Sequence, residues 1–435
     1  MKVKTGIKER IIVIVILALL AWYVVSIIEN KTEKRDPDIL TLWVAPNQVQ
    51  GLFWNKVVTD WNKSGQGLKV KFRSIPAASS SEQAILTAII SNTNPDMSTN
   101  IFSGFGAQLS SLNAVHPLSD FDGYDELIKE RKMEEIMKHW VYKGKNFIFP
   151  IYCNPTLFWW RWDKLQEHGF NKIPTTYSDL YEMAKKVTIP YKRYAIQAVR
   201  GRDWWDRWSD YIAYYYAAGN GAPYINVKEN KAVLDNKYSV EALTFIKKCI
   251  DNKWTMLEPL PNAFYQGWVF GAVHGPWDIL VVKQLYPKLL KVIKLGPILV
   301  PDSHKGPTYT YADSKGWVIF KSCQRKEEAW KFMKWVFSQD KYSKLWIEMT
   351  SMAPARGDLM QNPNFAEYYK THPIAKQYAG YVSRSIPTAF ITETLAVQSA
   401  MTNLVIEPLE YKTSTVKQAI KNLTEKINTI LKNKR

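Results

Sequence analysis

The sequence predicts an α/β fold built from two doubly wound lobes. The chain has 435 residues, of which 46% are hydrophobic, and this length exceeds what one hydrophobic core usually organises. Short apolar runs of strand type alternate with segments of helical period along most of the chain. No repeat, low-complexity tract or linker separates these blocks in the sequence. We therefore expect two lobes that the chain crosses several times.

The first block of alternation begins behind a polar spacer. Leu52 to Lys63 and Ser79 to Ser91 are the predicted helices, the second with Ser80 or Ser81 as N-cap. The predicted strands of this block are Ile39 to Val44, Leu68 to Ser74 and Met97 to Phe102.

Two later blocks repeat the alternation, with strands at Phe147 to Ile151 and Lys315 to Ile319. The helices predicted there are Ser178 to Val187, Trp204 to Ala218, Ser239 to Asn252, Lys326 to Ser338 and Ser414 to Lys432. We assign 39–150 and 310–352 to lobe 1, and 151–309 and 353–435 to lobe 2.

The N-terminal segment 1–38 is predicted to be a cytoplasmic tail, a transmembrane anchor and a spacer. The run from Ile11 to Ile28 is apolar except for Ser26, and basic residues precede it. About 20 apolar residues cross a bilayer, and the basic flank stays inside. No clean small-x-small site follows the run, so we expect an uncleaved, single-pass anchor in the cell membrane with the rest exported. Cleavage as a signal peptide is the alternative.

The net charge of +18 is spread along the chain, often beside Glu on amphipathic segments. This pattern does not predict nucleic acid as a partner, because a reader of nucleic acid gathers its basic residues on one element. A solvated surface, attraction to anionic lipid headgroups and an acidic ligand remain open. Cys153, Cys249 and Cys323 fit no metal spacing, so we interpret them as small buried residues, with one disulfide plus a free thiol as the alternative. No cofactor or metal is expected.

A series of motifs in fixed order carries a family resemblance. The motifs are Ala88 to Met97, Lys143 to Tyr152, Leu157 to Phe170, Ile173 to Leu180, Phe270 to Trp277, Gly316 to Lys321 with Ala329 to Met333, and Ser351 to Arg356. In this order they resemble the extracellular solute-binding proteins of the sugar type that serve ATP-binding-cassette importers, the group that contains maltose-binding protein. Trp160-Arg161-Trp162 and Tyr177 depart from the residues usual in the family.

The resemblance implies a periplasmic-binding-protein-like fold with a multi-strand hinge. Its implied crossings lie near Phe149 to Asn154, Thr308 to Asp313 and Ser351 to Arg356. It also implies a monomeric, non-enzymatic receptor that closes on a mono- or oligosaccharide and delivers it to the transmembrane subunits of a permease.

A sugar site needs aromatic rings beside convergent polar groups. Trp277 stands on a Gly-Pro turn, and Asp278 beside it could accept hydroxyl protons or cap the next helix. Asp203, Trp204 and Trp205 open a helix rich in charge and rings. The other candidates follow predicted strands or lie on predicted crossings: Asn47, Gln48, Gln50, Ser103, Phe105, Tyr152, Asn154, Tyr311, Asp313 and, by resemblance, Arg356.

Two alternatives to a neutral sugar stay open. The same fold could bind an anionic ligand, such as a uronate oligosaccharide or a sugar or glycerol phosphate, through Arg200, Arg202, Lys315 or Arg356. The second alternative is a membrane-anchored glycoside-processing enzyme. Such an enzyme needs two carboxylates at a set distance, and the sequence does not give that distance. The sequence contains no HExxH, P-loop or GxSxG motif, and this favours binding over catalysis.

Overall fold

The computed structural model describes residues 36–198, 204–257 and 260–433, with the side chains of 204–206 left undescribed. The predicted anchor from Ile11 to Ile28 lies outside these residues. Within them, no helix combines the length and hydropathy that a membrane span needs.

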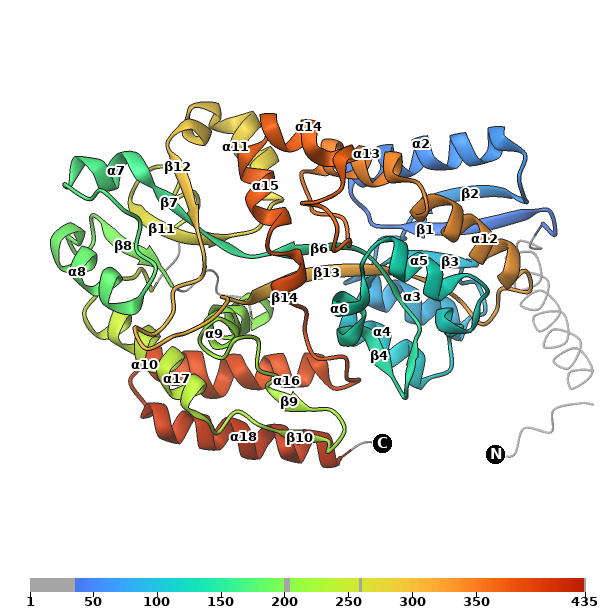
Figure 1. Cartoon of the computed structure of the whole chain (residues 1–435). Coiled ribbons are helices and arrows are strands. Elements are labelled where there is room, and N and C mark those ends of the chain that lie inside the picture. The colour runs from blue at the N-terminus through green and yellow to red at the C-terminus, as the bar shows by residue number, and fades with distance from the viewer. Residues whose placement is uncertain (1–35, 199–203, 258–259, 434–435) are drawn as a thin grey trace, which may run out of the picture.

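The first lobe is built on a mixed sheet, on the right in Figure 1. Its strand order is β14-β13-β3-β1-β2, and β6 also pairs with β13. β1 is parallel to both neighbours, whereas β13 is antiparallel to β3 and β6. The strands are β1 (Ile39–Val44), β2 (Lys69–Ser74), β3 (Met97–Phe102), β6 (Phe149–Pro155), β13 (Thr310–Ile319) and β14 (Ser385–Ile386).

Helices cover both faces of this sheet and bury its apolar residues. Trp54 packs edge-on against Trp317 at a centroid distance of 5.0 Å, so rings from α2 and β13 meet in this core. The helices are α2 (Gln48–Ser64), α3 (Ser81–Ile90), α4 (Ser103–Ser111), α5 (Tyr124–Glu130), α6 (Glu134–Met137), α12 (Lys326–Phe337), α13 (Asp340–Thr350) and α14 (Pro363–Thr371). A small hairpin pairs β4 (Val141–Tyr142) with β5 (Lys145–Asn146).

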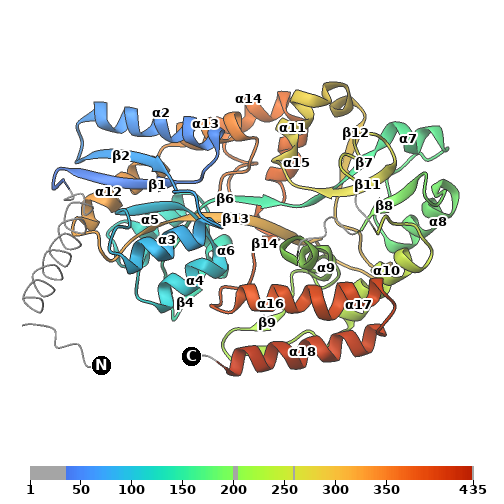
Figure 2. The ribbon, with the colours of Figure 1, turned by 180° about the vertical axis from the view of Figure 1, so that it is seen from behind.

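The second lobe has its own sheet, of order β12-β7-β11-β8, and a separate core. Its strands are β7 (Leu157–Arg161), β8 (Tyr194–Gln197), β11 (Val269–His274) and β12 (Ile293–Gly296), with the hairpin β9 (Ile225–Asn226) and β10 (Lys231–Ala232) beside them. Its helices are α7 (Trp162–Glu167), α8 (Tyr177–Val187), α9 (Trp204–Ala218), α10 (Lys237–Asp251), α11 (Asp278–Leu285), α16 (Thr394–Met401), α17 (Glu407–Glu410) and α18 (Val416–Lys432). Figure 2 shows α16 and α18 running side by side below α9.

Two extended segments join the lobes. Only Thr156 separates β6 from β7, so this segment passes from the first sheet directly into the second. β13 runs beside it, and the backbone NH of Thr156 donates to the carbonyl of Tyr311 at 2.9 Å. The hydroxyl of Thr310 donates to the carbonyl of Thr156 at 2.7 Å. These segments are the predicted crossings near Phe149 to Asn154 and Thr308 to Asp313.

The third passage differs from the expectation. Residues 353–355 do not cross between the lobes but lie against β6, where the NH of Cys153 donates to the carbonyl of Ala353 at 3.1 Å. Phe365 and Ala375 of α15 (Pro373–Ala379) pack in the first core. Tyr378 of the same helix packs in a lobe 2 cluster, where the indole NH of Trp159 donates to its hydroxyl at 2.6 Å. We propose that lobe 1 extends beyond residue 352 through α14 and that α15 lies between the two lobes and contacts both.

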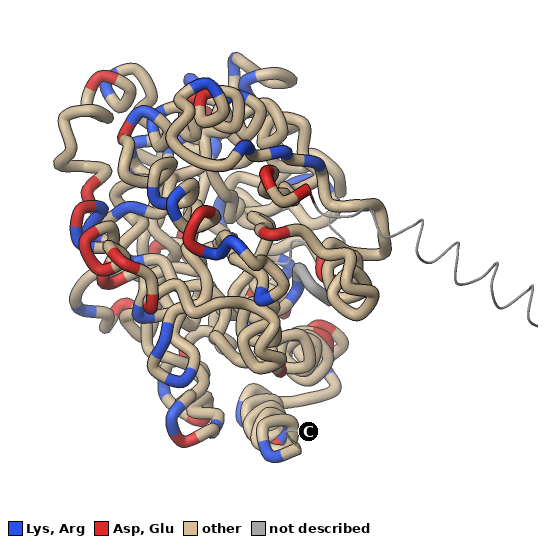
Figure 3. The backbone as a smooth tube through the Cα atoms, turned by 90° about the vertical axis from the view of Figure 1, so that its right-hand side faces the viewer, with Lys and Arg blue, Asp and Glu red and all other residues tan. Residues whose placement is uncertain are grey.

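Many predicted elements are confirmed. β1, β3 and α9 have the predicted bounds, but α2 begins earlier than expected, because the side chain of Asn47 accepts a hydrogen bond from the NH of Gln50 at 3.0 Å and caps the helix. All three cysteines are buried and unpaired, as expected. Figure 3 shows Lys and Arg interleaved with Asp and Glu around the outer end of lobe 1, without a single basic stripe.

Candidate ligand-binding site

A cavity of about 890 Å³ lies where the two lobes and the crossing strands meet. We call it the cleft. Residues from β13 form part of its wall, and the rest comes from both lobes. The described residues that line it are Ser79, Ser80, Glu82, Phe102, Ser103, Thr156, Gln197, Trp208, Ser209, Ala272, Val273, His274, Trp277, Asp278, Tyr311, Ala312, Asp313, Ser314, Lys315, Pro387, Thr388, Leu395 and Gln398.

The strand β13 brings a row of functional side chains to the cleft. Tyr311, Asp313 and Lys315 are spaced two apart, so they share one face of the strand. The ring of Trp208 from α9 meets that of Tyr311 edge-on, with centroids 5.0 Å apart. The row therefore places an aromatic pair next to a carboxylate and an amine.

Asp313 is the exceptional member of this row. Within the described part of the chain, its carboxylate makes no hydrogen bond or ion pair. Burial raises its pKa, and the charge of Lys315 opposes this rise. Opposite it on β6 lies Asn154, a predicted site residue that is fully buried, whose amide has no described partner, and that does not line the cleft. A desolvated carboxylate without a partner is an acceptor available to a ligand hydroxyl.

A tight turn at the end of β11 supplies the opposite wall. β11 ends at His274, and Gly275-Pro276 carries the chain to Trp277. The ring of Trp277 folds over Gly275, because a Cβ atom there would lie 2.1 Å from the indole. Gly275 thus leaves room for the partly buried indole of Trp277 at the cleft wall.

Asp278 is the first residue of α11, but its side chain caps no helix. Instead its Oδ2 lies 2.7 Å from Nδ1 of His274, which is four residues earlier in the sequence and ends β11. His274 is held in turn by aromatic neighbours: its ring centroid lies 4.9 Å from that of Trp159 and 5.0 Å from that of Phe264. This pairing fixes the Asp278 carboxylate at the cleft wall.

Ser103 connects lobe 1 to the returning chain. It begins α4 at the end of β3, and its hydroxyl donates to the carbonyl of Thr388 at 3.0 Å. The two hydroxyls are also hydrogen-bonded to each other. Ser103 therefore lies at the cleft floor, but part of its hydrogen-bonding capacity is already used.

Several predicted site residues do not line the cleft. Asn47, Gln48 and Gln50 follow β1, which is one strand further from β13 than β3 is, and Asn47 is used as a cap. Phe105 is 2% exposed, because the first turn of α4 directs its ring into the first core.

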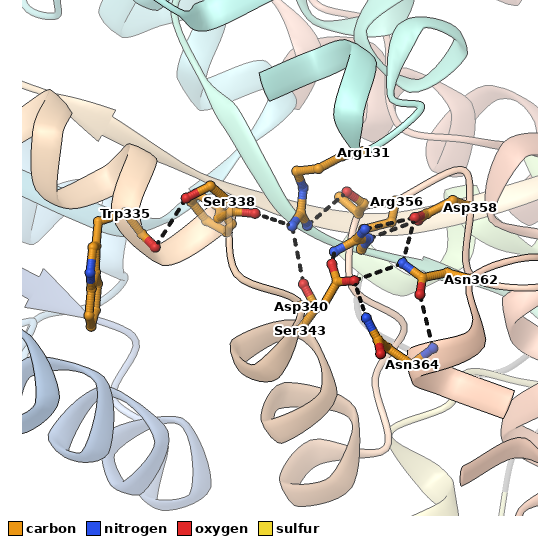
Figure 4. Close-up of polar contacts among 11 residues, drawn as sticks. Arg131, Trp335, Ser338, Asp340, Ser343, Arg356, Asp358, Asn362 and Asn364 are labelled. Atoms are coloured by element: carbon orange, nitrogen blue, oxygen red, sulfur yellow. Dashed lines mark hydrogen bonds and ion pairs between the residues drawn. The ribbon is translucent and has the colours of Figure 1, made fainter. Parts of the chain in front are cut away.

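The predicted hinge residues also lie behind the cleft wall. Tyr152 is buried and stacks on Trp346 with ring centroids 5.5 Å apart. Arg356 is 3% exposed and donates two hydrogen bonds to Asp358, at 2.8 and 2.7 Å, besides its pairing with Asp340 (Figure 4). The guanidinium is therefore occupied inside lobe 1, because the segment 353–356 packs on β6 rather than crossing to lobe 2.

Asp203 lies outside the described residues. Trp204 and Trp205 belong to the backbone of α9, but their side chains lie outside the description too.

Of the predicted residues, the structure brings Ser103, Trp277, Asp278, Tyr311 and Asp313 together in the cleft. It also adds residues that sequence reasoning did not select. Trp208 had a usable signal, since it lies one turn after Trp204 on the same helical face. Thr388 and Gln398 had none, because they reach the cleft only through the return of the chain along the second core.

No group of three or more His, Cys, Asp or Glu side chains within the described ranges could hold a metal ion. The cleft offers rings, hydroxyls, amides and carboxylates, which suit hydrogen bonding and stacking with a soluble organic molecule.

Comparison with known proteins agrees with this geometry. A family model described as bacterial extracellular solute-binding protein matches residues 56–373. A binding protein of Brucella abortus is 24% identical over 299 residues, which is 67% of this chain and 69% of that protein.

Solved structures show the same fold. An uncharacterized protein of Listeria monocytogenes has a TM-score of 0.84 and 31% identity, covering 91% of this chain and all of that one (100%). The cyclic α-maltosyl-1,6-maltose binding protein of Arthrobacter globiformis has a TM-score of 0.79 at 16% identity, covering 92% and 100%. The two-lobed fold and the family match over most of the chain confirm the predicted resemblance, and this protein belongs to the bacterial extracellular solute-binding proteins.

Proposed function

We propose that this protein binds a neutral carbohydrate in the cleft and delivers it to the transmembrane subunits of an ATP-binding-cassette importer. One observation carries the proposal: a cavity between two lobes combines aromatic rings with hydroxyl, amide and carboxylate acceptors. Trp277 offers a ring to the C–H face of a sugar, and Asp278 and Asp313 offer acceptors to its hydroxyls. The volume of about 890 Å³ lies in the range of small-molecule sites.

The charges of the cleft favour a neutral ligand over an anionic one. Glu82, Asp278 and Asp313 are the carboxylates among the described lining residues, and Lys315 is the one Lys or Arg among them. Arg356, a predicted anion ligand, is already paired with two aspartates inside lobe 1. Arg200 and Arg202 lie outside the described residues. An anion would therefore meet more negative than positive charge at this wall.

The relatives also favour binding over glycoside processing. The Arthrobacter neighbour is named for a maltose-type oligosaccharide, and this supports a carbohydrate as the ligand class. No chemical step is needed for capture and delivery.

The mechanism we propose is hinge closure about β6–β7 and β13. Ligand first contacts one lobe, and the closed form, which the ligand favours by differential affinity, is recognised by the permease. We further propose that the protein acts as a monomer and that segment 1–38 tethers it to the outer face of the cell membrane, which raises its local concentration at the permease.

A calorimetric titration of the purified chain with neutral and acidic saccharides tests the proposal. A neutral sugar should bind with an affinity that does not change with salt. Ligand at about 100 times its dissociation constant should add about 2.7 kcal/mol to the free energy of unfolding. Affinity that falls with ionic strength would instead support the anionic alternative.

Two further measurements complete the test. X-ray scattering should show a smaller radius of gyration with bound sugar, and an unchanged profile would contradict hinge closure. Chromatography of the same mixtures should recover the saccharides intact, whereas released products would show an enzyme.

A further inference from the structure

A second cavity, of about 730 Å³, lies on lobe 2 away from the cleft. We call it the lobe 2 groove. It is formed by the loop between α8 and β8, the C-terminal end of α10 with the residues after it, and Trp268 in front of β11. None of its described lining residues lines the cleft.

The groove exposes large apolar side chains. Tyr191 is 83% exposed, Leu260 47%, Trp268 42% and Leu257 36%. Beneath them, Met256 and Tyr194 belong to a small cluster separate from the main cores. Soluble proteins rarely leave neighbouring large apolar side chains in water without a binding role.

The backbone at the rim is held in an unusual conformation. Tyr191 has a φ of 67°, and Lys253 has a φ of 56°. Residues with bulky side chains rarely adopt this left-handed region, because of steric cost. The amine of Lys253 lies 5.4 Å from the centroid of the Tyr191 ring, so the two strained positions meet at the rim. The chain thus holds an aromatic ring outward rather than folding it into the core.

The charged side chains among the described lining residues of the groove are both lysines, whereas Glu258, between Leu257 and Leu260 in the sequence, lies outside the described residues. Lys192 and Lys253 line it, and its described lining residues include no Asp or Glu. Lys248, on the adjoining end of α10, lies with its amine 3.8 Å from the centroid of the Tyr181 ring and has no described carboxylate partner. The surface therefore combines exposed Trp and Tyr, aliphatic side chains and lysines, which is the composition that proteins use at the boundary between headgroups and acyl chains.

We propose that the lobe 2 groove docks on a membrane surface that contains anionic lipids. Tyr191 and Trp268 would lie at the headgroup level, Leu257 and Leu260 toward the acyl chains, and the lysines against lipid phosphates. A soluble sugar fits less well, because Thr255 is the one uncharged polar residue besides the tyrosines among the described lining residues.

The position of the groove on lobe 2 would let this contact orient the protein on the membrane. The described chain starts at Asp36, whose carbonyl accepts a hydrogen bond from Arg325 of lobe 1. β8, which supplies Tyr194 to the groove lining, lies at the opposite end of the molecule (Figures 1 and 2). The tether that we propose for segment 1–38 would join the membrane at the lobe 1 end and leave the long axis free to swing, so this step rests on the proposed function. A second contact at the lobe 2 end would hold that axis along the membrane. This inference does not depend on the identity of the cleft ligand.

The test uses the full chain reconstituted in nanodiscs of phosphatidylcholine, alone or mixed with phosphatidylglycerol. Hydrogen exchange is measured on segments 189–194 and 254–257. We expect exchange to slow at least about fivefold in the anionic discs and not in the neutral ones. The double variant Tyr191→Ser/Trp268→Ser and the double variant Lys192→Gln/Lys253→Gln should each lose this protection.

Tyr411→Ser is the matched control, since Tyr411 is 69% exposed on the same lobe but outside the groove. It should keep the protection, and an unchanged thermal midpoint shows that each variant is folded. Equal protection in neutral discs, or equal loss in the control, would overturn the proposal. So would protection that appears only when the permease is added, because the groove would then face a protein.

Discussion

Two polar clusters near the hinge differ in how fully their groups are paired. Around Arg356, both carboxylates are paired: its guanidinium pairs with Asp340 and Asp358, and Asn362 donates to both carboxylates at 2.9 Å (Figure 4). Burial would raise the pKa of Asp358, but hydrogen bonds from Arg356 and Asn362 hold it below its usual value. On β13, by contrast, Asp313 has no hydrogen-bond partner in the described structure, and burial raises its pKa.

This difference in pairing suggests different roles for the two clusters. A saturated buried cluster stabilises the fold and has little left to offer a ligand, whereas an unsaturated carboxylate at a cavity wall is costly until a ligand satisfies it. The same contrast explains why the arginine that looked most like a ligand contact in the sequence is buried inside lobe 1. Four substitutions test the contrast.

The largest effect is expected for Arg356→Met, which leaves Asp358 and Asp340 without their cation. Breaking a buried ion pair in this way costs about 3 to 5 kcal/mol, so the free energy of unfolding in urea should fall by about that amount. Sugar affinity of the folded fraction should stay unchanged. The control Lys370→Met removes an exposed pair with Glu367 and should change stability by less than about 0.5 kcal/mol.

The same cluster predicts a pH dependence. The pKa values of Asp340 and Asp358 are both lowered from 3.8 in the folded protein. Their stabilisation is therefore fully present above pH 3.8 and is lost as the pH falls below it. Arg356→Met should flatten this acid limb of the stability curve, and an equally steep limb in the variant would contradict the assignment.

Trp277→Ala should weaken sugar binding by about 2 kcal/mol, or about thirtyfold, because the stacking ring is removed from the cleft wall. Calorimetry measures this loss, and the unfolding midpoint should change little. Trp268→Ala removes an exposed tryptophan outside the cleft and should leave affinity unchanged. Equal losses in both variants would remove Trp277 from the site.

Asp313→Asn should affect affinity and stability in opposite directions. Affinity should fall about tenfold, because a charged acceptor is replaced by a neutral one. The raised pKa means that folded protein loses stability as the pH rises through the range in which Asp313 ionises. The variant lacks this loss and should be slightly more stable at neutral pH, by less than about 1 kcal/mol.

Asp120→Asn, at an exposed ion pair with Lys145, is the control for this trade-off and should change neither quantity measurably. Weaker binding together with lower stability in Asp313→Asn would instead show that the carboxylate belongs to a structural cluster like that of Arg356.

The smallest effect is expected for Gly275→Ala. The new Cβ would lie 2.1 Å from the present position of the Trp277 ring, so the ring must move, and affinity should change about threefold. Gly51→Ala is the control, because a Cβ there meets nothing within 4 Å. An unchanged affinity in Gly275→Ala would show that the position of the ring does not matter to the ligand.

The site was partly predictable because two of its signals are local. Trp277 follows Gly275-Pro276, so it lies on a turn and not on the buried face of a regular helix or strand. Tyr311 and Asp313 alternate on one strand, so one face of that strand had to carry both. Phe105 was predicted as a site residue because it also follows a strand. Its ring is instead buried, because the first turn of α4 directs it into the core.

The sequence by itself determined the alternating elements, the two-lobe α/β architecture and the family, since hydrophobic period and ordered motifs are properties of neighbouring residues. Only the tertiary structure decided that Arg356 is paired with Asp340 and Asp358, that residues 353–355 lie against β6, and that Thr388 and Gln398 reach the cleft. Pairing of charges and lining of a cavity depend on contacts between residues far apart in the chain, and no local pattern records those contacts.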